Sequence, residues 1–106
     1  MKITAVRVNG MDLTVFDTNY SRSFYNSFIE FCIDNCLNRR QFSEEFQRIV
    51  KLSPDDPTFG RAIHYGRIIE YHGFFYSDWL NNETKIRIMN KMAREIGFEL
   101  EITTIP

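Results

Sequence analysis

The sequence predicts an α+β domain: a small antiparallel sheet, formed by an N-terminal hairpin and a C-terminal strand, with three or four helices packed on one face. Three observations lead to this fold class. Residues 21–37 are apolar around almost the whole circumference of a helix, β-rich runs stand near both ends of the chain, and an amphipathic helical pattern precedes the last run. With 106 residues, the chain has the length of one globular domain, residues 1–106, whose core needs no metal or disulfide.

Residues 2–17 predict a β-hairpin. Two β-rich runs, KITAVRV and LTVFD, flank Asn9-Gly10-Met11-Asp12, and Asn-Gly is the strongest short-range hairpin signal. Two alternating sets of side chains compete for the inner face of the first run, and we favour Val6 and Val8. Leu13 and Val15 are expected to face the core from the second run.

Residues 21–37 predict a central, buried helix. Apolar side chains recur at steps of three and four, and the polar face is reduced mainly to Asn26, Glu30 and Asp34. The start of this helix is not fixed, because four good N-cap residues stand close together: Asp17, Thr18, Asn19 and Ser21.

The two cysteines, Cys32 and Cys36, are four residues apart within this helix. A disulfide at that spacing fits a helix poorly, so we expect both thiols to be reduced and buried.

A second, amphipathic helix is expected after residue 38. Asn38 is its predicted N-cap with Gln41 at N3, Leu37 is expected to pack on Phe42 across that cap, and Ser53-Pro54 ends the helix.

Residues 55–73 are the ambiguous part of the chain. Asp55-Asp56-Pro57 is a helix-start signal and Gly73 a helix-stop signal, so the caps predict a helix of about four turns. Gly60, Gly66 and many β-branched and aromatic residues favour instead a hairpin through Gly66 or Gly73. We predict the helix and keep the hairpin as its alternative.

The C-terminal part predicts a helix followed by a strand. Ser77 and the Asn81-Asn82-Glu83 cluster both offer starts, and Gly97 ends the helical pattern. Residues 98–103 alternate apolar and polar side chains, as in a half-buried strand, which we expect to join the N-terminal hairpin.

Composition excludes some broad classes of protein. The net charge of -1 lacks the electrostatic footprint of a nonspecific nucleic-acid binder and that of a polyanion mimicking DNA. The sequence has no recognisable secretory signal and no apolar run of membrane-spanning length. We therefore expect a cytoplasmic protein that does not bind or span a membrane. Few alanines and many Ile, Phe and Asn residues fit an AT-rich coding genome such as a phage genome; the protein would then act in the host cytoplasm.

The sequence contains no motif that is typical of catalysis or of cofactor binding. The only residues that suggest zinc are Cys32, Cys36, His64 and His72, whose C-x3-C and H-x7-H spacings do not match a zinc finger. No nucleophile motif surrounds either cysteine, and the glycines are too far apart for a phosphate loop. We therefore expect a protein that is not an enzyme, with no metal and no cofactor.

The leading hypothesis is a small interaction protein that binds a larger protein or enzyme complex and modulates it, by inhibition. The composition favours one kind of interaction protein, an inhibitor of a host or defence system that is encoded by a phage or mobile element. Residues 59–79 combine arginines, histidines and aromatics, the side chains typical of binding hot spots. The predicted partner-binding residues are Arg61, His64, Arg67, Tyr71, His72, Tyr76 and Trp79.

Two alternatives remain. Arg87, Lys91 and Arg94 step by four and three along the last helix and form a row suited to nucleic acid or a nucleotide, with base stacking on Tyr71 or Tyr76. A second basic group consists of Arg39-Arg40, Arg48 and Lys51. The other alternative is an assembly subunit whose edge strand 98–103 or aromatic segment forms a homodimer.

Overall fold

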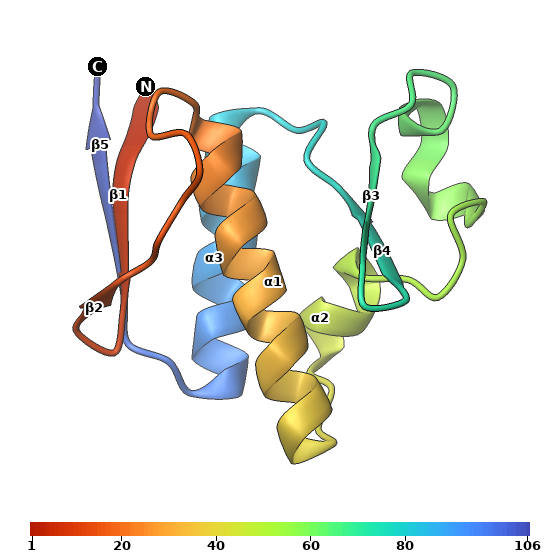
Figure 1. Cartoon of the computed structure of the whole chain (residues 1–106), viewed down its shortest axis with the longest axis horizontal. Helices are drawn as coiled ribbons and strands as arrows, with labels where there is room; N and C mark the ends of the chain where they lie inside the picture. Colours follow the sequence, from red (N-terminus) through yellow and green to blue (C-terminus); the bar gives the residue numbers. More distant parts are fainter.

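Residues 1–106 are described by a computed structural model, which confirms the α+β class. A three-stranded antiparallel sheet lies on one side, α1 and α3 run side by side against one of its faces, and a two-stranded hairpin with α2 lies beyond the helices (Figure 1). The elements are β1 (Lys2–Val8), β2 (Met11–Asp12), α1 (Ser21–Arg39), α2 (Glu44–Ile49), the 3-10 helix η1 (Pro57–Ala62), β3 (Ile68–Tyr71), β4 (Phe74–Ser77), α3 (Asn82–Ile96) and β5 (Leu100–Ile105).

The larger sheet has the order β2-β1-β5, with both neighbours antiparallel to β1. This confirms the N-terminal hairpin and its pairing with the C-terminal strand. The second strand is Met11–Asp12, which the sequence assigned to the turn, and the predicted run over residues 13–17 is not a strand. Leu13 and Val15 still pack partly buried against the core.

A register shift in β1 determines which side chains reach the core. The pairing of β1 with β5 shifts between Ile3 and Ala5, and Ile3, Val6 and Val8 are all buried. In a regular strand Ile3 and Val6 would point to opposite faces, but one extra residue reverses the alternation. Val6 and Val8 face the core as predicted, and the shift adds Ile3 to them.

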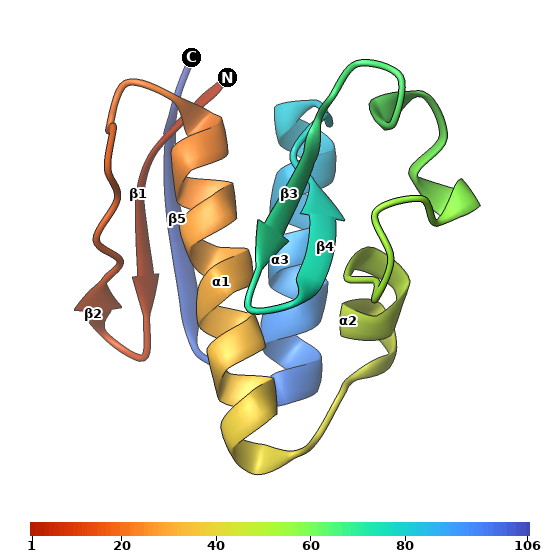
Figure 2. The ribbon, with the colours of Figure 1, turned by 45° about the vertical axis from the view of Figure 1, so that its right-hand side comes forward.

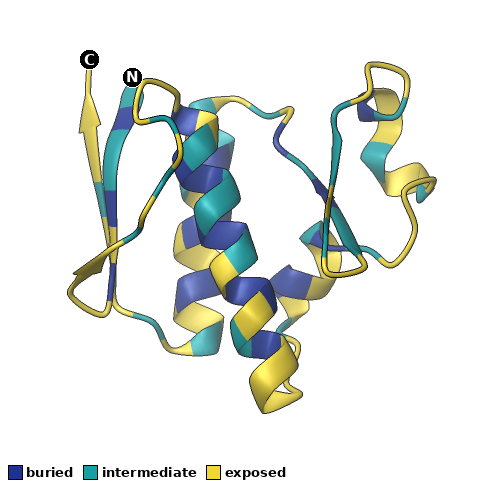
Figure 3. Cartoon of the chain, in the orientation of Figure 1, coloured by how far each residue is buried: buried dark blue, intermediate teal, exposed yellow.

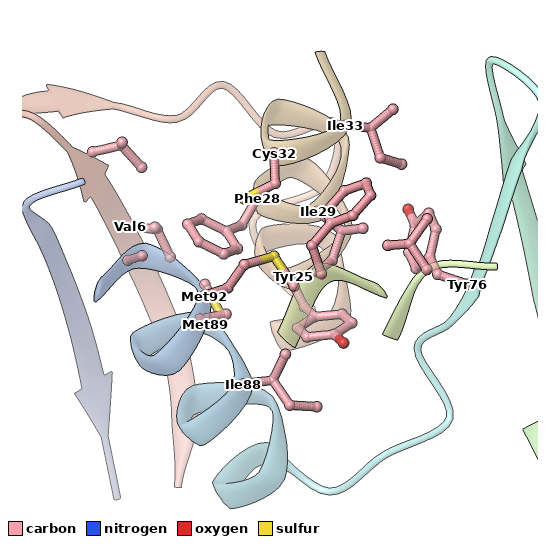
Figure 4. Packing of buried hydrophobic residues seen from close by; sticks show 14 of the residues in the cluster. Val6, Tyr25, Phe28, Ile29, Cys32, Ile33, Tyr76, Ile88, Met89 and Met92 are labelled. Atoms are coloured by element: carbon pink, nitrogen blue, oxygen red, sulfur yellow. The ribbon is translucent and has the colours of Figure 1, made fainter. Parts of the chain in front are cut away.

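Helix α1 is the centre of the core, as predicted. Tyr25, Phe28, Ile29, Cys32 and Ile33 are completely buried on it (Figure 4). Both cysteines are free and buried, and burial raises the pKa of the Cys32 thiol.

None of the predicted N-cap residues caps α1. Its N-cap is Tyr20, which makes no side-chain cap hydrogen bond. Ser21 Oγ instead accepts a hydrogen bond from the backbone N–H of Ile3 at 2.8 Å, which ties the helix start to β1.

The predicted start of the second helix is wrong. Helix α1 continues through Asn38 to Arg39, and Arg40 ends it in the left-handed conformation with φ 54°. Helix α2 begins only at Glu44, because the Ser43 hydroxyl accepts from the Phe46 N–H at 3.2 Å and caps its first turn.

The predicted helix over residues 55–73 is also wrong, and its alternative, the hairpin through Gly73, is correct. Asp56 does cap a helix start, since its carboxylate accepts from the Thr58 N–H at 2.9 Å. The helix is only the six-residue η1, because Gly60 adopts φ 58° and ψ -130°, outside the helical region. Strands β3 and β4 then pair, with Ile68 opposite Ser77 at the open end and Tyr71 opposite Phe74 at the turn (Figure 2).

The C-terminal elements match their prediction closely. The Asn81 side chain accepts from the Thr84 N–H at 2.8 Å to start α3, and Gly97 ends it with φ 96°. Strand β5 forms one edge of the larger sheet. Buried residues line the inner faces of α1, α3 and β1, while the outer edge of β5 and much of η1 are exposed (Figure 3). The structure contains no helix with the length and hydrophobicity needed to cross a bilayer.

Candidate functional site

Four of the seven predicted contact residues lie around the open end of the β3–β4 hairpin. Arg61 and His64 are exposed on η1 and the turn after it, and Arg67 and Trp79 flank the two strands. Trp79 is 44% exposed and Tyr65 62% exposed, and their rings pack against each other at a tilt of 50°, with centroids 5.0 Å apart. These two rings form an aromatic pair that is already assembled in the free protein.

Arg67 holds the hairpin in place. Its Nη2 lies 3.4 Å from Oδ1 of the buried Asp78, and Asn26 of α1 donates a hydrogen bond to Asp78 Oδ2 at 3.1 Å. The three side chains therefore join the hairpin to α1. Since a buried carboxylate needs its partners, Arg67 has a structural role that its sequence position did not reveal.

The other three predicted contact residues lie elsewhere. Tyr71 and His72 are at the turn of the hairpin, where the Tyr71 hydroxyl donates to the Asp34 carboxylate at 2.9 Å. This hydrogen bond raises the pKa of Tyr71. Tyr76 is completely buried, so it is removed both from the predicted contact surface and from base stacking.

The structure brings together two members of each basic group that the sequence kept apart, whereas Arg39 and Arg40 lie at the end of α1. Arg48 and Lys51, from α2 and its C-terminal end, lie with Arg87 and Lys91 of α3 around shared hollows. Arg94, the third member of the predicted row, is exposed farther along α3 and lines neither hollow.

Glu45 is the negative charge within this basic cluster. Although charged, it is only 1% exposed, and its carboxylate binds Arg48 at 2.6 and 2.9 Å and Lys91 at 3.6 Å. The hydrogen bond from Arg48 lowers the pKa of Glu45, so the group is ionised at neutral pH. Glu45 therefore links α2 to α3 electrostatically.

A cavity of about 370 Å³ adjoins the cluster, between α2, η1, the end of β4 and the start of α3. Tyr25, Ala62 and Ile88 are its buried lining residues, whereas Arg87 and Trp79 lie at its exposed side. Three cations, Arg48, Lys51 and Arg87, line the cavity, and no carboxylate does. Hydroxyl groups of Thr58, Ser77 and Thr84 and apolar side chains complete the wall.

The Tyr25 hydroxyl is the unusual polar group of this cavity. It is buried and has no hydrogen-bond partner. Burial, followed by the charge of Glu45, raises the pKa of Tyr25, so the hydroxyl keeps its proton and remains a donor.

The residues considered for zinc are not brought into one site. Cys32 and Cys36 are buried in α1, whereas His64 and His72 are exposed near opposite ends of the hairpin. No group of three or more His, Cys, Asp or Glu side chains is placed to hold a metal ion.

Sequence reasoning missed several residues of this region. Tyr65 was expected in the core because of its residue type, but it is exposed. Tyr25 lies within the apolar helix pattern, where Phe would fill the core equally well, so it did not stand out. The one available signal was the phenol itself, since a buried tyrosine usually has a partner for its hydroxyl. Lys51 was noted only as a member of a basic group and Phe59 only as the start of an aromatic segment, because their position beside the cavity depends on tertiary packing.

The geometry defines a small α+β domain with an exposed aromatic pair and a basic cavity. No protein-family model matches the chain, and no curated protein or solved structure matches it either. Its function is therefore inferred from its own residues.

Proposed function

We propose that this chain is a small interaction protein, not an enzyme, that binds a larger protein or enzyme complex and modulates its activity by inhibition. The observation that carries this proposal is the exposed pair of packed rings, Tyr65 and Trp79, with Arg61 and His64 exposed on the same segment. Tyr, Trp and Arg are the residue types that dominate the binding energy of protein interfaces.

The aromatic pair suits binding because it is preorganised. Each ring already packs against the other, so little side-chain freedom is lost when a partner covers both. An aromatic side chain buries roughly 150–250 Å² and supplies much of the hydrophobic gain of an interface. The hairpin beneath the pair is fixed to α1 by Arg67, Asp78 and Asn26, which makes the platform rigid.

The chemistry of the surface defines the kind of partner. Two adjacent rings fit an apolar depression, and the exposed Arg61 favours carboxylates at its rim. The amino-acid composition fits an AT-rich coding genome, which supports a phage or mobile element as the source. The target would then be a host or defence complex in the cytoplasm.

Affinity capture of the tagged protein from a host lysate, with nuclease treatment, tests this function. We expect one protein or complex at near-stoichiometric amount, retained after nuclease and lost from Tyr65→Ala. Phe16→Ala is the matched control: it removes a fully exposed ring from the connection between β2 and α1, beside the sheet (Figure 1). Equal capture by wild-type protein and Tyr65→Ala would contradict the proposed surface.

A second candidate function is binding of single-stranded nucleic acid along α3. It is favoured by the convergence of Arg48 with the exposed row Arg87, Lys91 and Arg94. Binding should fall steeply with salt, and Arg94→Gln should reduce the salt slope by about one phosphate contact. Absence of binding to oligonucleotides at low salt would exclude this candidate.

A further inference from the structure

We propose that the cavity between α2, η1, β4 and α3 binds a small nucleoside phosphate, with the phosphate on the basic cluster and the base against the aromatic wall. This inference depends on neither proposed function. It moves the nucleotide site suggested by the sequence from the outer row of α3 into a cavity that is open on one side.

Charge is the first argument. Arg48, Lys51 and Arg87 line the cavity from two helices, and no carboxylate lines it. Lys91 adds a fourth cation in the adjoining hollow, while Glu45 is the single acid there and binds Arg48 and Lys91. Several cations approaching from different directions suit a phosphate dianion better than a single carboxylate.

The Tyr25 hydroxyl is the second argument, and it is independent of the first. Figure 4 shows the Tyr25 ring beside Ile88, with the hydroxyl on the side away from Phe28 and Met92. Tyr25 and Ile88 both line the cavity, and the hydroxyl has no partner. A buried donor without a partner is destabilising, and a ligand oxygen that reached it from the cavity would satisfy it.

The apolar wall is the third argument. Phe59, Trp79 and Leu80 line the cavity together with the cations. Aromatic side chains bind nucleobases by stacking, whichever base is present. The volume of about 370 Å³ lies within the range of small-molecule sites, so the ligand is a mononucleotide rather than a polymer.

Isothermal titration of the purified chain with AMP, GMP, CMP and UMP tests this inference, with adenosine and inorganic phosphate as partial ligands. We expect at least one nucleotide to bind with a Kd below about 1 mM and more tightly than adenosine or phosphate. Quenching of Trp79, the only tryptophan, gives a second readout at the cavity itself.

Variants locate the binding site. Arg87→Gln should weaken nucleotide binding about tenfold, because a charge-assisted hydrogen bond is lost. Tyr25→Phe should weaken it about fivefold without unfolding the chain, since it removes only an unpartnered hydroxyl. Arg94→Gln is the matched control on the same helix, and it should leave the Kd unchanged, because Arg94 does not line the cavity.

Three results would overturn the inference. The first is no binding of any of the four nucleotides, and the second is equal weakening by Arg87→Gln and Arg94→Gln. The third is binding of oligonucleotides alone, which would favour the row on α3.

Discussion

Glu45 shows how one buried carboxylate organises a junction of helices. Its side chain binds Arg48 on its own helix and Lys91 on α3, while its backbone N–H donates to Glu95 Oε1 at 2.8 Å. The last contact places a carboxylate of α3 at the N-terminus of α2, where the helix dipole favours negative charge. Removing Glu45 would leave cations unpaired at this junction.

Stability below neutral pH should depend on Glu45. Hydrogen bonding to Arg48 holds its folded pKa below the ordinary value of 4.5, so the unfolded state binds the proton more readily. The stabilisation is fully present above pH 4.5 and is lost as the pH falls through the folded pKa. We expect thermal unfolding scans from pH 7 to pH 3 to show a falling Tm, and Glu45→Gln to flatten this decline.

The matched control for that measurement is Glu99→Gln, an exposed carboxylate outside the junction. Burial, followed by the charge of Asp34, raises the pKa of Glu30, so this group stabilises the fold more as the pH falls, the opposite of Glu45. This contribution is the same in every variant. An unchanged pH dependence in Glu45→Gln would show that the junction does not stabilise the fold through this charge.

Two hairpins in this chain end in the same kind of turn. Asn9-Gly10 has φ values of 51° and 80°, and His72-Gly73 has φ values of 50° and 81°. Positive φ at both central residues is the requirement of a type I′ turn, which matches the twist of the paired strands. Sequence reasoning predicted the first turn because Asn-Gly is a strong signal for it, whereas it kept the turn at Gly73 only as an alternative, because His adopts positive φ less often than Asn.

Replacing His72 by Asn should therefore stabilise the β3–β4 hairpin. We expect His72→Asn to raise the free energy of unfolding by about 0.5 kcal/mol, since Asn tolerates positive φ at this position better. Urea unfolding measures the change. The reverse exchange, Asn9→His, should destabilise the protein, because Asn9 Oδ1 also accepts a hydrogen bond from the Glu99 N–H at 2.9 Å. A less stable His72→Asn variant would contradict this view of the turn.

The elements that sequence predicted well are those whose local signals agree with their packing. In α3, the Asn81 cap, the helical periodicity and Gly97 all indicate one helix, which the structure confirms. Around η1 the signals conflict: Asp56 starts a helix as predicted, but Gly60 leaves helical geometry four residues later. A cap residue fixes where a helix begins, whereas the length of the helix depends on the residues beyond its first turn.

At the scale of the whole molecule, the side of the helix layer away from the sheet gathers the candidate functional groups. Tyr25 comes from α1, Lys51 from the end of α2, Phe59 from η1 and Arg87 from α3. Such residues share a cavity only in the folded chain, because they come from four elements in different parts of the sequence. No spacing in the sequence relates them, which is why the basic groups were predicted as two separate clusters.

The same arrangement explains why only part of the predicted contact surface remains. A helix would have placed Arg61, His64 and His72 along one side, but the hairpin separates His72 from the other two. The surface that remains is centred on Trp79, and the structure adds Tyr65 to it.

The most direct test of the central claim is the Kd of the captured partner for the wild-type chain, Tyr65→Ala and Phe16→Ala, measured with purified components. Tyr65→Ala should weaken binding by about 30-fold, the effect of losing one aromatic hot spot, while Phe16→Ala stays within about twofold of wild type. Unfolding scans on the same samples confirm that each variant is folded. If Tyr65→Ala binds as tightly as the wild-type chain, the aromatic pair is not the binding surface and the proposed mode of interaction is wrong.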